Sequence, residues 1–270
     1  MIAAAEILPH QGAEAIQREG ADLTDEELAA RLAEGAGRLL MELRSATFPA
    51  DRRLGIVADK VANAFILTSL REWRPDDPIL SEESPDRLER LTSDRLWIID
   101  PLDGTREYSE GRNDWAVHVA LAVGGEPRLG AVALPARGKL YRSDRVQRAD
   151  VARERPLMVV SRTRPPPEAE TIAALLGAEL VPLGSAGAKA MAVVSGEADI
   201  YYHSGGQHEW DNCAPAAVAL RAGLHASRVD GTALLYNNRE SLVPDLVIAR
   251  RELADRIVAF CNSGTSKEAS

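Results

Sequence analysis

The chain has 270 residues, of which 45% are hydrophobic and 27% charged, and its 41 acidic and 32 basic residues give a net charge of −9. This balance is typical of globular proteins and excludes general disorder and a fibrous repeat. The acidic charge argues against binding to a nucleic-acid polymer or an anionic membrane. No apolar run reaches the roughly eighteen residues of a transmembrane helix, and Cys213 and Cys261 have the spacing of neither a disulfide framework nor a zinc site. We therefore expect a cytoplasmic protein.

The first part of the chain is predicted to combine two helices with an antiparallel sheet. A capping box at residues 24–27 and the leucines that follow it at helical spacing predict a helix to about Leu43. A second helical pattern runs from Asp59 to about Trp73. Apolar runs then predict the strands of a meander, at 96–99, 115–123, 129–135 and 139–142.

The second part alternates strands with helices, which is typical of an α/β domain. Strands are expected at 157–160, 180–183, 199–202 and 246–249, and helices at 168–176, 187–196, 212–223 and 251–262. A charged stretch between the two parts gives a boundary, with one domain at 1–150 and the other at 151–270. The first twenty residues and the tail from Asn262 are expected to be loosely held or disordered.

Acidic residues gather at the ends of apolar runs in three places, which are Ser81-Glu82-Glu83-Ser84, Asp100-Pro101-Leu102-Asp103-Gly104-Thr105 and Trp210-Asp211. In the second motif, an apolar run leads directly into Asp100, and Gly104 allows the backbone to approach a ligand closely. Two carboxylates on one tight turn cannot both be buried and ionised without a cation. Oxygen donors of this kind suit Mg²⁺ or Mn²⁺ better than zinc.

Each of these residues also has a simpler interpretation. The fragment D-P-x-D-G is common in surface turns, but the buried-type run before it and the acidic motifs elsewhere favour a metal site. Asp59 could be the N-cap of a helix that begins at Lys60. His118 lies in an apolar strand and is expected to be an ordinary core residue whose hydrogen bonds are satisfied, so no catalytic histidine is predicted.

The segment IIDPLDGT (98–105), preceded by SEES and followed by WD, resembles the inositol monophosphatase superfamily of magnesium-dependent, lithium-sensitive phosphatases. The similarity extends over about residues 25–260 and includes ADKVANAFIL (58–67), GSAGAKAMAVVSGEADIYY (184–202) and EWDNCAPAAVALRAG (209–223). It implies a layered αβαβα sandwich with an α+β part, 1–150, that binds metal and an α/β part, 151–270, that binds substrate.

Within the superfamily, the sequence is more similar to the CysQ branch of 3′-phosphoadenosine 5′-phosphate phosphatases than to the inositol enzymes. The segment Arg106-Glu107-Tyr108, the lysine Lys189 and the stretch RVDGTALLYNNRES (228–241) carry this similarity. The chain departs from that branch at Ala186 and Gly187, where serines are common, and at His203, where arginine is common and inositol enzymes have glutamate. These departures affect the expected substrate contacts and not the expected metal chemistry.

The resemblance implies two to three Mg²⁺ ions, for which Mn²⁺ can substitute and which Li⁺ inhibits. One ion would be held by Glu82, Asp100 and the carbonyl of Leu102. A second would be held by Asp100, Asp103 and Asp211, and a third would lie near Glu82 and Asp59.

The resemblance also implies roles in the reaction. Thr105 with Asp59 would activate the attacking water. The substrate would contact the backbone N–H groups of Gly104 and Thr105 and the residues Ser185, Lys189, His203 and Asp211. For Ser185 the alternative is a cap of the helix that follows it.

The expected function is hydrolysis of the 3′-phosphate of 3′-phosphoadenosine 5′-phosphate to AMP and phosphate. The expected binding partner is thus a small phosphorylated metabolite, and the protein is expected to be a monomer or a homodimer. Hydrolysis of inositol-1-phosphate or fructose-1,6-bisphosphate is the alternative with the same chemistry. A magnesium-dependent phosphometabolite sensor without turnover is the alternative from another class.

Overall fold

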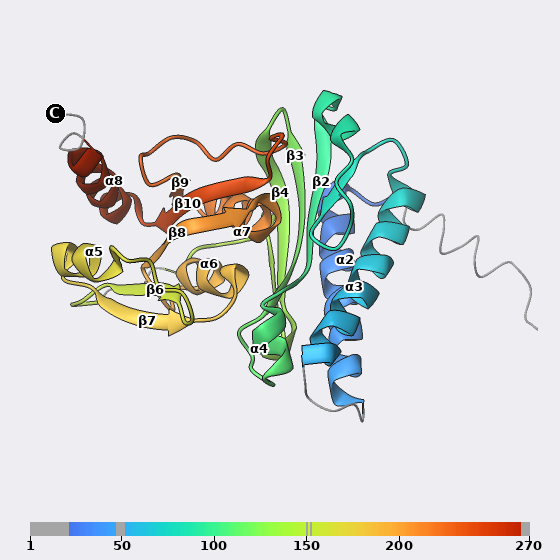
Figure 1. Ribbon diagram of the computed structural model, residues 1–270, viewed down its shortest axis with the longest axis horizontal. Coiled ribbons are helices and arrows are strands. Elements are labelled where there is room, and N and C mark those ends of the chain that lie inside the picture. The colour runs from blue at the N-terminus through green and yellow to red at the C-terminus, as the bar shows by residue number, and fades with distance from the viewer. Residues whose placement is uncertain (1–21, 47–51, 150, 152, 266–270) are drawn as a thin grey trace, which may run out of the picture.

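The computed structural model describes residues 22–46, 52–149, 151 and 153–265 (Figure 1). The expectation for the first twenty residues therefore lies outside the described chain, as does that for residues 266–270. The expectation of disorder from Asn262 onward is wrong for the residues that are described, because helix α8 (Arg251–Thr265) continues through them.

The first sheet contains five strands in chain order: β1 (Ile79–Ser81), β2 (Arg95–Asp103), β3 (Ala116–Val123), β4 (Glu126–Leu134) and β5 (Lys139–Arg142). Strand β1 is parallel to β2, and the later neighbours are antiparallel, which confirms the predicted meander. Strands β2 and β3 are buried along almost their whole length, as expected for strands covered on both faces.

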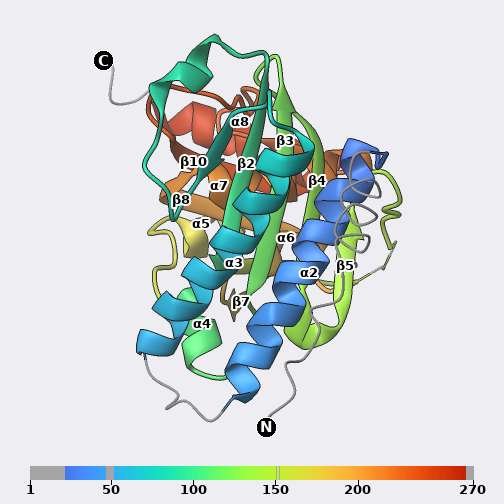
Figure 2. The same ribbon diagram turned by 90° about the vertical axis from the view of Figure 1, so that its right-hand side faces the viewer.

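Helices α2 (Asp25–Ser45) and α3 (Arg52–Trp73) lie side by side on one face of this sheet (Figure 2). The predicted cap of α2 is confirmed, because the side chain of Thr24 accepts a hydrogen bond of 3.2 Å from the amide of Glu27. Leucines at helical spacing, such as Leu28 and Leu32, are fully buried between α2 and the sheet.

The second sheet has the order β7-β6-β8-β10-β9. Its strands are β6 (Leu157–Ser161), β7 (Glu179–Leu183), β8 (Ile200–His208), β9 (His225–Ser227) and β10 (Leu242–Ala249). Strand β6 is parallel to both β7 and β8, whereas β10 is antiparallel to β8 and β9.

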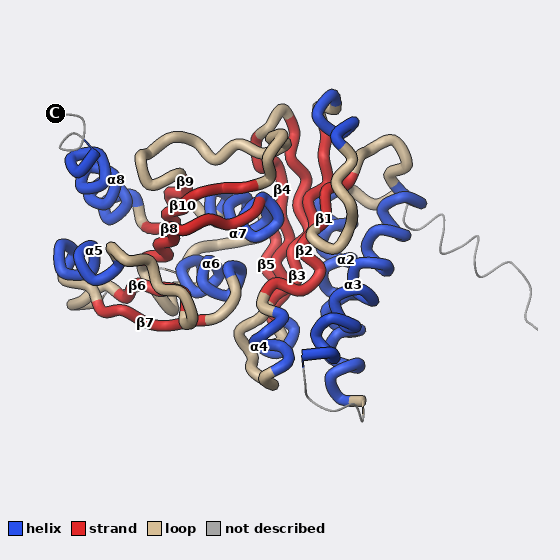
Figure 3. Tube along the Cα trace, viewed as in Figure 1, coloured by secondary structure: helices blue, strands red, loops and turns tan. Residues whose placement is uncertain are grey.

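Helices α6 (Ala186–Val194) and α7 (Glu209–Arg221) fill the space between the two sheets, and α5 (Ala169–Leu176) and α8 cover the outer face of the second sheet (Figures 1 and 3). One apolar core lies in each gap between helices and sheet, and the central core joins α6 and α7 to both sheets. The layers are therefore αβαβα, as expected from the resemblance.

Several elements differ from the prediction. Helix α3 already begins at Arg52 in the described chain, and α7 begins at Glu209. Strands β1 and β9 and helix α4 (Thr105–Ser109) were not predicted, because a strand of three residues and a helix of little more than one turn are too short to show a period. Within the described residues, no helix is both long enough and apolar enough to span a membrane.

Candidate active site

Asp100 and Asp103 lie at the end of β2, where the pairing with β3 is irregular. Asp100 is opposite His118 and Asp103 is opposite Ala116, so three steps along β2 match two along β3. Residues three apart in a regular strand face opposite sides of a sheet, and one extra residue brings them to the same side. Pro101, which has no N–H for the ladder, lies inside this bulge. The spacing D-P-x-D thus directs both carboxylates toward α7.

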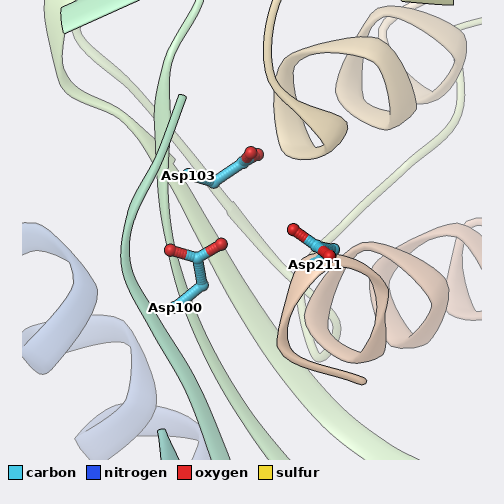
Figure 4. Close-up of side chains that lie close together, drawn as sticks. All are labelled: Asp100, Asp103 and Asp211. Atoms are coloured by element: carbon cyan, nitrogen blue, oxygen red, sulfur yellow. The ribbon is translucent and has the colours of Figure 1, made fainter. Parts of the chain in front are cut away.

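Asp211 supplies a third carboxylate from the first turn of α7. Its Oδ2 accepts a hydrogen bond from the amide of His208, which closes a capping box at the start of the helix. One oxygen from each of Asp100, Asp103 and Asp211 lies within 4.8 Å of the other two. Figure 4 shows these carboxylates around a common space between β2 and α7.

The carboxylates of this cluster cannot all be ionised in a buried site without a compensating cation. Burial and the charges of Glu82, Asp103 and Asp211 raise the pKa of Asp100 well above its ordinary value. Burial and the charge of Asp103 raise the pKa of Asp211 to about 6. Oδ2 of Asp100 is buried and has no hydrogen-bond donor in the described part of the chain. Carboxylates that repel one another, with one buried oxygen that has no donor, fit a hard divalent cation.

Asp59 approaches the same cluster from α3. The side chain is buried, and burial together with Glu82 and Glu83 raises its pKa to about 8. The alternative in which Asp59 caps a helix at Lys60 is wrong, because α3 already extends from Arg52 and the amides next to Asp59 lie inside the helix.

Glu82 follows β1 at the exposed rim of the cluster. Partial desolvation and the charges of Asp211 and Asp103 raise the pKa of its carboxyl to about 7. Glu82 does not belong to the set of carboxylates within 4.8 Å, which contains Asp100, Asp103 and Asp211. Its role as a metal ligand, like that of the Leu102 carbonyl, stays a prediction.

Thr105 is the first residue of α4, directly after Gly104, which adopts a left-handed φ of 90°. The Thr105 hydroxyl donates to the carbonyl of Leu102 at 3.2 Å, so its one proton is not directed to Asp59 and its lone pairs can accept from a water molecule. Helix α3 packs directly on Thr105, since a Cβ added to Gly55 would lie 2.7 Å from its Cγ2. Asp59 is one turn beyond Gly55 and thus on the same face of α3.

Helix α6 binds the carboxylate of Asp103 through its first turn. Oδ2 accepts from the hydroxyl of Ser185 and the amide of Gly187, both at 2.7 Å, and Oδ1 accepts from the amide of Ala186 at 3.1 Å. The Ser185 hydroxyl also accepts from the amide of Ala188 at 2.9 Å, which confirms the alternative in which Ser185 caps the helix that follows it. These bonds join the end of β2 to the start of α6 at the site.

A cavity of about 490 Å³ opens beside Asp103 and Asp211. Its lining includes all the residues predicted to contact substrate, which are Gly104, Thr105, Ser185, Lys189, His203 and Asp211. Lys189 is buried on α6, donates to the carbonyls of Gly184 and Ser185, and has its pKa lowered to about 8 by burial. The structure therefore gathers these side chains around one space, and their contacts with substrate stay a prediction.

His118 is not the ordinary core residue that the sequence suggested. It is fully buried in β3, but its Nε2 lies 3.2 Å from Oδ2 of Asp103 and its Nδ1 lies 3.0 Å from the carbonyl oxygen of Trp210. The bulge in β2 causes this, because it turns Asp103 toward the face of β3 that carries His118. The available signal was one polar residue in an apolar strand beside the acidic motif.

The sequence reasoning also missed two arginines of the β6–α5 loop that line the cavity. Arg162 binds Glu107 and Glu110, each at 2.8 Å, whereas Arg164 lies exposed at the rim. Charged residues in a loop are usually solvated, so the segment gave no specific signal.

The chain resembles bacterial phosphatases along most of its length. It is 51% identical over 249 residues to the 3′-phosphoadenosine 5′-phosphate phosphatase of Mycobacterium leprae, an alignment that covers 87% of this chain and 92% of that protein. It is 34% identical over 232 residues to the 3′(2′),5′-bisphosphate nucleotidase CysQ of Escherichia coli K12, covering 79% and 94% of the two chains.

A solved structure has the same fold. The crystal structure of CysQ from Bacteroides thetaiotaomicron, a bacterial member of the inositol monophosphatase family, matches with a TM-score of 0.74 and 26% identity and covers 84% of this chain and 97% of that one. Residues 24–264 match the sequence model of the Inositol monophosphatase family. Because this match and the sequence identities extend over most of the chain, the chain belongs to the inositol monophosphatase family.

Proposed function

We propose that this protein is a Mg²⁺-dependent phosphatase that hydrolyses the 3′-phosphate of 3′-phosphoadenosine 5′-phosphate to AMP and phosphate. The observation that carries the proposal is the set of buried carboxylates from Asp100, Asp103 and Asp211, with one oxygen of each within 4.8 Å, beside a cavity that contains a buried lysine. The names of the relatives at 51% and 34% identity support this substrate over an inositol phosphate.

The metal ions would be held by oxygen ligands from both halves of the molecule. Asp100, Asp103 and Asp211 would hold one Mg²⁺, and Glu82 with Asp100 and the Leu102 carbonyl would hold another. When bound, Mg²⁺ offsets the negative charge of the phosphoryl oxygens and lowers the pKa of water. A third ion near Glu82 and Asp59, and replacement by Mn²⁺, belong to the same proposal.

Thr105 and Asp59 would prepare the attacking water. The hydroxyl of Thr105 is fixed by its bond to the Leu102 carbonyl, which leaves an oxygen lone pair to accept a hydrogen bond from the water and orient it. Asp59 lies on the α3 face that packs against Thr105. Burial, Glu82 and Glu83 raise its pKa to about 8, and a bound cation would favour the ionised carboxylate, which is the form that can accept a proton from the water.

The cavity beside the carboxylates would hold the rest of the substrate. Gly104 and Thr105 would place the scissile phosphate, and Ser185 would hold Asp103 in reach of it. Lys189 would attract the second phosphate, because its ammonium group is buried on the cavity wall. His203 lines the same wall and would contact the nucleoside.

A phosphate-release assay tests the proposal. The purified chain would be given 3′-phosphoadenosine 5′-phosphate, inositol-1-phosphate or fructose-1,6-bisphosphate, each with EDTA, Mg²⁺, and Mg²⁺ plus Li⁺. We expect Mg²⁺-dependent and Li⁺-sensitive release, fastest from the nucleotide.

Two variants separate catalysis from binding alone. Asp100→Asn should abolish release, whereas Asp94→Asn, a matched change at an exposed position near the other end of β2, should leave it unchanged. Faster release from the inositol or sugar phosphate would overturn the choice of substrate. Mg²⁺-dependent binding of the nucleotide without release would indicate the sensor.

A further inference from the structure

Asp103 has unequal oxygens in this structure. A carboxylate oxygen offers two lone pairs in the plane of the group. Oδ2 already accepts from Ser185 and Gly187 and lies 3.2 Å from Nε2 of His118, whereas Oδ1 accepts from Ala186 alone. Oδ1 is therefore the oxygen with a lone pair left for a metal ion, and the orientation of the carboxylate decides whether it faces the cluster.

His118 connects this carboxylate to the helix that carries Asp211. The carbonyl of Trp210 can only accept, so Nδ1 of His118 donates to it at 3.0 Å. Trp210 directly precedes Asp211 in the first turn of α7. One rigid ring from β3 thus contacts the side chain of one predicted metal ligand and the backbone next to another.

The space for this ring exists because residue 187 is glycine. A Cβ at that position would lie 2.2 Å from Nε2 of His118 and 2.9 Å from the Cβ of Ala116, both closer than van der Waals contact, and the ring is fully buried. Nε2 also lacks a well-aligned hydrogen bond within the described residues. Its contact with Oδ2 of Asp103 is therefore an electrostatic contact that depends on where the ring is held. His118 and Gly187 therefore depend on each other.

We propose that His118 is a positioning residue for the metal site, which holds Oδ2 of Asp103 and the start of α7 so that Oδ1 and Asp211 face one cation, and that Gly187 is required to admit it. The inference rests on the proposed function only in the identity of the cation. Partners of metal ligands commonly change metal affinity by about 10–100-fold when they are removed.

The first experiment measures Mg²⁺ binding by isothermal titration calorimetry, without substrate. His118→Phe keeps the ring and removes both nitrogens, and we expect a loss of Mg²⁺ affinity of about 10–100-fold. His118→Gln keeps an amide near the position of Nε2 and should recover most of the affinity. Phosphate release should show the loss as a higher Mg²⁺ half-saturation with a smaller change in kcat.

The second experiment is a double-mutant cycle in EDTA, read as the Tm. Gly187→Ser should lower the Tm strongly in the parent and less in His118→Asn, where the shorter side chain removes the 2.2 Å contact and the 2.9 Å contact with Ala116 remains. Gly130→Ser is the matched control, because its Cβ would meet the backbone oxygen of Ala214 at 2.5 Å, and His118→Asn should not rescue it.

Unchanged Mg²⁺ affinity in His118→Phe, or an equal loss of Tm from Gly187→Ser in both backgrounds, would overturn the inference. Neither measurement uses the nucleotide. A parent protein that binds Mg²⁺ and shows the coupling but releases no phosphate would contradict the proposed function and leave the role of His118 standing.

Discussion

Replacing Asp59 with asparagine should stabilise the metal-free protein while it removes activity. Burial and repulsion from Glu82 and Glu83 raise the pKa of Asp59 from 3.8 to about 8. Between these two pKa values the folded protein keeps a proton that the unfolded chain loses. The contribution of Asp59 to stability is therefore fully present below pH 3.8 and is lost as the pH rises toward about 8. At pH 7 the difference corresponds to about 4 kcal/mol of unfolding free energy.

Thermal unfolding in EDTA measures this effect. With about 2 °C per kcal/mol for a chain of this size, Asp59→Asn should raise the Tm by about 8 °C at pH 7, and by clearly less at pH 5. Saturating Mg²⁺ should reduce the difference in Tm between the variant and the parent, because a cation favours the ionised carboxylate of the parent. Phosphate release by the variant should fall in Mg²⁺ at every pH.

Asp77→Asn is the control with the opposite sign. The Asp77 carboxylate accepts hydrogen bonds from Arg95 and from the indole of Trp97, and Arg95 and Trp97 lower its pKa against the effect of desolvation. Its replacement should lower the Tm. If Asp59→Asn has a Tm at or below that of the parent, or if the difference in Tm does not widen from pH 5 to pH 7, the raised pKa of the buried Asp59 carboxyl is wrong.

Three further variants test other parts of the site. Asp211→Asn should remove most of the rise in Tm that Mg²⁺ gives the parent, measured by thermal unfolding with and without the ion. Lys189→Met should raise the KM for the bisphosphate by about 10-fold, while KM for 3′-AMP, which lacks the second phosphate, changes less. Arg90→Met should lower the unfolding free energy, measured by urea titration, by about 2 kcal/mol. The reason is that its buried guanidinium donates hydrogen bonds to Asp86 and to the loop at 237–238, and an unchanged urea midpoint would contradict this.

Much of the layered fold could be predicted because its long elements carry strong local patterns. The capping box before α2, the apolar run of β3 and the alternation of strands and helices after residue 157 were sufficient for the order of the elements. The start of α3 was placed too late, because Arg52-Arg53 before the first buried leucine, Leu54, gives no cap signal.

The candidate site could be predicted as a set of residues but not as an electrostatic arrangement. In the sequence, the two aspartates of D-P-x-D are chemically equivalent, and both were assigned as metal ligands. In the structure their pKa values move in opposite directions. Burial and neighbouring carboxylates raise that of Asp100, whereas His118, Lys189 and the amide of Gly187 outweigh burial and lower that of Asp103 to about 2.

The residues that cause this difference come from β3 and from α6, more than 80 positions away in the case of Gly187. The spacing around Asp103 does not predict these contacts, because they depend on the bulge in β2 and on the position of α6 against the first sheet. A permanently ionised Asp103 next to a readily protonated Asp100 implies that the cation site fills as Asp100 loses its proton. Glu82 and Asp211, whose pKa values are raised to about 7 and about 6, must also lose protons when the cation binds. Mg²⁺ affinity should therefore rise with pH in the parent and less steeply in Asp100→Asn, and a parent affinity that is constant between pH 5 and pH 8 would contradict the arrangement.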